Sequence, residues 1–96
     1  MREEFWKAFD DAEELGEATV MVVADMAYLR WRNDIHELTD LIMVINHKSW
    51  SHHDCGNDRL SELYAELYYK YYDKAINYLD QNNREEELTY FIRTLD

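Results

Sequence analysis

The sequence predicts an all-α protein, a compact bundle of four or five helices, and three observations support this class. The 96 residues include two glycines and no proline, whereas strand-rich domains of this size use both at their turns. The stretch 58–80 has the strongest helical periodicity and contains six of the eight tyrosines. Three tryptophans, eight tyrosines and three phenylalanines supply enough large apolar side chains for a core without disulfides. We therefore expect residues 1–96 to form a single helical domain.

The first two predicted helices differ in their polar content. Residues 2–15 are amphipathic and end before Gly16, a residue suited to a helix C-terminus. The side chains expected to point inward are Phe5, Ala8, Phe9, Ala12 and Leu15. Residues 17–32 have almost no polar side, which predicts the most buried helix of the bundle. Their single acid, Asp25, should lie at the rim or pair with an arginine or with a tyrosine hydroxyl of segment 58–80, because an unpaired buried carboxylate is costly.

Two turns bound a third helix. Asp34 followed by Glu37 has the form of a capping arrangement, which predicts a helix start there. Its inward face should be Ile35, Leu38, Leu41, Ile42 and Ile45, and it should end at about residue 47 or 50. The periodicity then fails over residues 47–57, and Gly56 with Asn57 marks the turn into the next helix.

The long helix at 58–80 carries two apolar stripes. The first comprises Leu60, Leu63, Tyr64, Leu67, Tyr71, Ala75 and Tyr78, and the second comprises Ala65, Tyr69, Tyr72, Ile76 and Leu79. Two stripes indicate either a central helix covered on two sides or a helix with one side reserved for a partner. After it, Asn83 with Glu86 is expected to cap a short final helix, and the short connections predict antiparallel neighbours.

A cluster of histidines and the only cysteine follows the third helix. His47, His52, His53 and Cys55 lie within nine residues, and imidazole and thiolate are zinc ligands. The spacing matches no standard zinc motif, so two other interpretations stay open: a solvated polar elbow, or a Cys55 nucleophile with a histidine base. No glycine-rich loop that could form an oxyanion hole accompanies such a nucleophile, and we expect no enzymatic activity.

Charge gives the main indication of function. The formal net charge is −11, which repels nucleic acid and anionic membranes and attracts basic protein surfaces. Winding residues 1–17 as a helix places four carboxylates on one side: Glu3, Asp10, Glu14 and Glu17. Tyrosines are favoured interface anchors, so Tyr69 and Tyr72 of the second stripe are candidate partner contacts. One cysteine, no leader peptide and no spanning segment predict a soluble cytoplasmic protein.

In size, charge and helical class, the whole chain resembles the small phage-encoded inhibitors of bacterial defence, the anti-CRISPR and anti-restriction proteins. The resemblance carries over no individual residue. It implies stoichiometric, non-catalytic binding to a nuclease in a bacterial host cell. We therefore expect an inhibitor that binds a basic surface of a nucleic-acid-handling protein. The alternatives are a structural homodimer paired through the second tyrosine stripe and a toxin-neutralising immunity protein or antitoxin.

Overall fold

The computed structural model describes residues 2–96, which form five helices and no strand. The helices are α1 (Arg2–Leu15), α2 (Glu17–Trp31), α3 (Ile35–Asp54), α4 (Asp58–Gln81) and α5 (Glu85–Leu95). The predicted all-α class and the long tyrosine-rich helix are confirmed. None of the helices in residues 2–96 combines the length and the hydropathy of a membrane-spanning segment.

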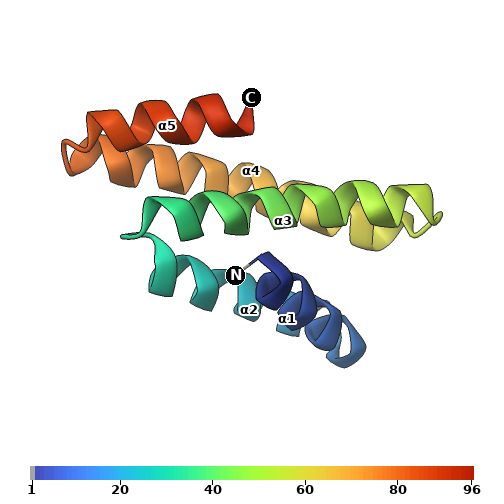
Figure 1. Cartoon of the computed structure of the whole chain (residues 1–96). Helices are drawn as coiled ribbons and strands as arrows, with labels where there is room; N and C mark the ends of the chain where they lie inside the picture. The colour runs from blue at the N-terminus through green and yellow to red at the C-terminus, as the bar shows by residue number, and fades with distance from the viewer. Residues whose placement is uncertain (1) are drawn as a thin grey trace.

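The helices are arranged in three layers (Figure 1). The antiparallel pair α3 and α4 forms the central layer, and these two helices share the most extensive contact in the bundle. The hairpin of α1 and α2 packs against one face of this pair, and α5 packs against the other. The layers give an elongated body of 39 × 23 × 20 Å.

The central position of α4 explains its two apolar stripes. Most of the first stripe is buried towards α1, α2 and α3, with Tyr64 and Tyr71 fully enclosed. The second stripe is covered by α5 over part of its length, where the ring of Tyr72 lies 5.4 Å from that of Phe91. Tyr69, one turn earlier, is 68% exposed. The alternative of a central helix covered on two sides is therefore confirmed. A short part of the second side remains open at Tyr69, and a partner for that part stays a prediction.

The prediction that the second helix is the most buried is wrong. In α2 only Val20, Ala24 and Tyr28 are buried, because this helix belongs to an outer layer. The most buried helix is α3, which contacts all four other helices. Its buried residues are Leu38, Thr39, Leu41, Ile42, Val44, Ile45 and Lys48.

The predicted partner of Asp25, a tyrosine hydroxyl of the long helix, is confirmed, since the hydroxyl of Tyr71 donates to its Oδ1 at 3.1 Å.

The helix termini confirm some of the predicted turns and correct others. Asp34 caps α3 by accepting hydrogen bonds from the backbone N–H groups of His36 and Glu37, at 3.1 and 3.2 Å. The expected end of α3 near residue 47 or 50 is wrong, because the helix continues to Asp54 and terminates before Gly56, whose φ is +77°. Asn83 is not a helix cap: it has a φ of +57°, and α5 begins at Glu85.

In α1, Phe5, Phe9 and Ala12 are buried as predicted. Ala8 is exposed, and Leu15 at the end of the helix is 78% exposed, so the inward face is narrower than expected. Gly16 then reverses the chain with a φ of +119°, a conformation that residues other than glycine rarely adopt. This one-residue connection makes α1 and α2 an antiparallel hairpin, visible at the lower edge of Figure 1.

Candidate protein-interaction surface

The outward side of α2 carries four large apolar side chains in solvent, which we call the α2 strip. Met21 is 47% exposed, Val22 56%, Met26 65% and Leu29 52%. At 100° per residue these four positions fall within one broad side of the helix, opposite the buried Val20, and the half-buried Asp25 lies between Met21 and Leu29. An exposed apolar side on a helix of a well-packed bundle is typical of an interaction surface rather than of ordinary solvent-facing sequence.

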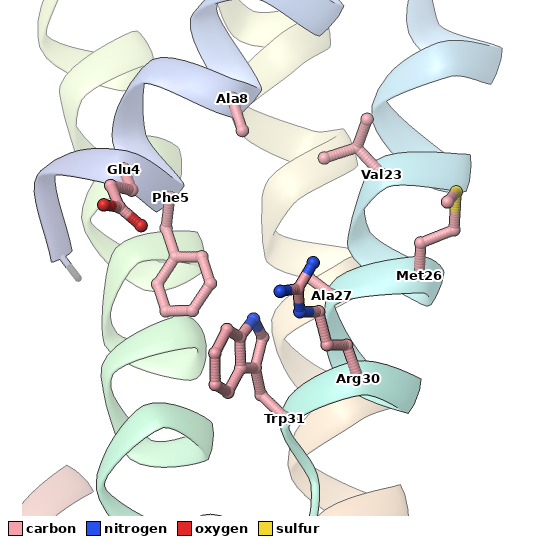
Figure 2. Close-up of a pocket in the computed structure, with 8 residues that line it drawn as sticks. All are labelled: Glu4, Phe5, Ala8, Val23, Met26, Ala27, Arg30 and Trp31. Carbon is pink, nitrogen blue, oxygen red and sulfur yellow. The ribbon is translucent and has the colours of Figure 1, made fainter.

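A groove between α1 and α2 borders the α2 strip (Figure 2). It encloses about 440 Å³. Its lining residues are Glu4, Phe5, Ala8, Val23, Met26, Ala27, Arg30 and Trp31. Met26 belongs to both the strip and the groove, so the two form one continuous surface.

Local sequence explains the shape of this groove. The short side chains of Ala8 and Ala27 leave space between the two helices, whereas the rings of Phe5 and Trp31 close one end. These rings meet edge to face, with centroids 6.5 Å apart and an interplanar angle of 78°. The guanidinium of Arg30 lies 5.0 Å from the centroid of the Trp31 ring, and Glu4 stands on the α1 side. The groove is thus mostly apolar, with the Arg30 guanidinium directed into it from α2 and Glu4 on the α1 side, and such a site can hold an amphipathic group.

The four carboxylates predicted to contact a partner divide into two pairs. Asp10 and Glu17 are engaged within the molecule: Asp10 pairs with the Lys48 ammonium, and Glu17 pairs with the Arg59 guanidinium. Glu3 and Glu14 are exposed on α1, and no salt bridge involves either of them among residues 2–96. The predicted acidic side is thus partly used to hold α1 against α3.

Sequence reasoning did not identify Lys48, which is the centre of a polar cluster between α1, α3 and α4. Its side chain is 3% exposed and pairs with Asp10 and, at 3.2 Å, with Glu13. Its Nζ also lies 4.4 Å from the centroid of the Trp6 ring. Glu13 in turn accepts hydrogen bonds from the Tyr64 hydroxyl at 2.5 Å and shares one with His52 at 3.1 Å.

The pKa values in this cluster follow from its hydrogen bonds. Burial acts to raise the pKa of Glu13, but hydrogen bonds from Tyr64, His52 and Lys48, with the charge of Lys48, outweigh it and lower the pKa. The pKa of the Tyr64 hydroxyl is raised, first by burial and then by its hydrogen bond to the Glu13 carboxylate. Glu13 therefore stays ionised and Tyr64 protonated at neutral pH, which fits a structural ion-pair network joining three helices.

The structure disperses the residues of the predicted zinc cluster. His47 pairs with the guanidinium of Arg2 at 2.5 Å, and the ring of His52 stacks on Tyr64 at 5.6 Å. His53 packs edge to face against Trp50, and Cys55 is exposed. Across residues 2–96, no three His, Cys, Asp or Glu side chains are grouped so that they could hold a metal ion. Zinc binding stays a prediction of the sequence, and this arrangement does not favour it.

The two tyrosines predicted as partner contacts lie on a different side of the bundle from the α2 strip. Tyr72 is half-buried against Phe91 of α5, and Tyr69 is exposed next to Tyr68, with ring centroids 5.5 Å apart. Since α5 and the α1–α2 hairpin cover opposite faces of the central layer, these tyrosines and the α2 strip cannot contact one small partner together. The α2 strip has four large apolar side chains that are exposed, whereas of these two tyrosines only Tyr69 is exposed.

Sequence reasoning also missed the α2 strip, although its signal was present. The near absence of polar residues from 17–32 predicts a buried helix. The same pattern is also compatible with a helix that has one side covered by its own chain and another side open to a second molecule.

Comparisons of this chain with family models, with curated proteins and with solved structures found no match.

Proposed function

We propose that this protein is a non-catalytic binding protein that attaches to a basic surface of another protein through the α2 strip and the adjoining groove. The observation that carries the proposal is the exposure of Met21, Val22, Met26 and Leu29 along one helix. Each apolar side chain left in water forgoes roughly 1 kcal/mol or more of burial free energy. Burying all four against a partner would recover that free energy, and a central apolar patch is where binding energy concentrates in interfaces.

Electrostatics supports a basic partner. The formal net charge is −11, and only part of the acidic excess is paired internally. Glu4 lines the groove, and Glu3, Asp11 and Glu14 are further exposed acids of α1. Such a field accelerates encounter with a positively charged protein surface and disfavours nucleic acid and anionic membranes.

The consequence of such binding would be inhibition of nucleic-acid handling. Basic protein surfaces commonly bind the phosphate backbone, where lysines and arginines displace condensed counterions. An acidic protein seated on that surface competes with the nucleic acid for the same side chains. We therefore propose a bacterial nuclease of a defence system, a CRISPR effector or a restriction enzyme, as the target, in agreement with the class that the chain resembles in size and charge.

The test is to capture the partner with a tagged wild-type chain and a tagged Val22→Asp/Leu29→Asp variant from the same bacterial lysate. Both substituted side chains are more than half exposed, so the variant should fold, which circular dichroism can verify. The matched control is Trp50→Gln, which removes a similarly exposed apolar residue, 62% exposed, near the C-terminal end of α3 and outside the α2 strip.

The proposal predicts that the wild type and Trp50→Gln retain the same nucleic-acid-handling protein, that the double variant loses it, and that retention weakens as salt rises. In a purified assay, the wild type should then inhibit nucleic-acid binding by that protein. Equal retention by the double variant and the wild type would refute the role of the α2 strip, and retention unchanged by salt would refute the electrostatic part.

A further inference from the structure

We infer that the groove between α1 and α2 receives one basic amphipathic helix of the partner, with a large apolar side chain seated over Ala8 and Ala27 and a lysine or arginine beside Glu4. The inference rests on the proposed function and specifies the contact by which the partner is held. Three properties of the surface lead to it: its length, its lack of backbone hydrogen-bonding groups, and the placement of its charges.

The first property is length. The groove lies between two antiparallel helices, and the apolar surface continues beyond it through Met26 onto Val22 and Leu29 of the α2 strip. A small molecule filling the groove of about 440 Å³ would leave Val22 and Leu29 exposed. A helix lying along the groove would bury the groove together with these two side chains through residues spaced i, i+3, i+4 and i+7, as helix-in-groove complexes do.

The second property is the absence of backbone partners. The groove is walled by helical side chains, and the backbone of α1 and α2 is committed to its own intrahelical hydrogen bonds. An extended peptide placed there would leave its N–H and C=O groups without partners in an apolar environment, at a cost of about 1–3 kcal/mol for each. A helix satisfies its own backbone, so only its side chains need to fit.

The third property is the placement of charge. On α1, Glu4 lines the groove, and the exposed Asp11, which pairs with Lys7, follows Glu4 and Ala8 at helical spacing on the same side of the helix. On the α2 wall, Arg30 is held over the Trp31 ring. A partner helix with lysines or arginines on the flank facing α1 is complementary to this pattern. A second copy of this chain is not, because pairing would bring together two molecules of net charge −11.

The probe is a designed helical peptide of leucine and lysine in which the leucines form one face. Its binding to the isotopically labelled wild-type protein is followed by NMR. The inference predicts chemical-shift changes centred on Ala8, Val23 and Ala27, with none of comparable size on α5. A peptide of the same composition with scattered leucines, and one with glutamate in place of lysine, should bind at least about tenfold more weakly, a loss of about 1.4 kcal/mol.

The decisive variant is Ala8→Trp, which fills the groove from an exposed position and should leave the fold intact. Its matched control is Thr94→Trp, at an exposed position of α5 on the opposite side of the central layer. Ala8→Trp should raise the Kd of the leucine–lysine peptide about tenfold or more, whereas Thr94→Trp leaves it unchanged. Peptide binding that Ala8→Trp does not weaken, or shift changes centred on α5, would overturn the inference.

The same variants separate this inference from the proposed function. A target that is lost with Val22→Asp/Leu29→Asp and retained with Ala8→Trp would leave the binding function standing and overturn the groove contact. A target retained with both would overturn the proposed function as well, because neither the α2 strip nor the groove would then contribute to its capture.

Discussion

Lys48 has the least exposed charged side chain of any ion pair in the described residues, and its pairs with Asp10 and Glu13 join α1 to α3. Replacing Lys48 with alanine leaves the largely enclosed Glu13 carboxylate without its cation. We expect a loss of about 2–4 kcal/mol in the free energy of unfolding, somewhat below a fully buried pair because Asp10 is half exposed. Urea denaturation measures this loss.

The matched control for that prediction is Lys7→Ala. Lys7 pairs with Asp11 one turn along the same helix, and both side chains are more than two-thirds exposed. An exposed pair of this kind contributes roughly 0.5 kcal/mol or less. Equal effects of the two substitutions would contradict the structural role assigned to Lys48.

Glu13 should make stability depend on pH in the acid range. Its pKa in the folded state lies below the ordinary value of 4.5, so the unfolded chain binds the proton more readily. The stabilisation by the carboxylate is therefore complete above about pH 4.5 and is lost as the pH falls through the lower, folded-state pKa. In urea titrations between pH 6 and 3, Glu13→Gln should be less stable than the wild type at pH 6, and the difference should shrink towards pH 3. A constant difference would count against this role.

At the scale of residues, the sequence predicts contacts whose partners are fixed by local pattern or by necessity. The Asp34 cap involves only the backbone N–H groups of nearby residues in the sequence. Asp25 is the only acid in the apolar part of its helix and needs a hydrogen-bond partner there, which is the Tyr71 hydroxyl. Lys48 could not be placed in this way. Its counter-ions, Asp10 and Glu13, lie on another helix. Lysine side chains are rarely buried, so the sequence alone predicts that Lys48 is exposed to solvent.

Among the helices, the start of α3 offers a direct test of capping. Asp34→Ala removes a side chain that accepts from two backbone N–H groups, and we expect it to destabilise the protein by about 1 kcal/mol. Asn57 occupies the corresponding position of α4 but makes no side-chain hydrogen bond to the helix. Asn57→Ala should therefore cost less than Asp34→Ala in thermal or urea denaturation, and the reverse order would contradict this description.

Helix existence was predictable, whereas the environment of each helix was not. An apolar pattern on all sides of 17–31 is equally compatible with an enclosed helix and with one that keeps a side for another molecule, so the α2 strip could be found only from the layer order. Similarly, the polar residues after His47 weaken the apolar periodicity without breaking a helix, and α3 continues until Gly56 terminates it.

For the whole molecule, the charge of −11 and the α2 strip act in opposite directions on self-association. Burial of the strip favours pairing, while repulsion between two acidic copies opposes it. We expect a monomer of 11.7 kDa in sedimentation velocity at micromolar concentration and moderate salt, with pairing promoted only at high salt. A stable dimer at low salt would instead favour the structural homodimer, and protection of either Tyr69 or Met26 would identify its interface.

Composition and periodicity were sufficient to predict the class of this fold, because glycine and proline content and apolar spacing are properties of the chain alone. The order of the layers depends on which faces fit together, and neither composition nor periodicity contains that information. The same limit applies to the candidate site: the acidic excess was predicted from the sequence, but the groove arises only when Ala8 and Ala27 meet across two helices.

The most direct test of the account is site-specific photo-cross-linking from the α2 strip. A benzophenone amino acid is placed at Met26 in one variant and at Trp50 in another, both exposed and on different parts of the molecule. The account predicts that Met26 cross-links at low salt to a basic helical segment of one nucleic-acid-handling protein, that Trp50 does not, and that Ala8→Trp suppresses the product. Cross-links from Trp50 but not from Met26, to any partner, would show that the binding surface lies elsewhere.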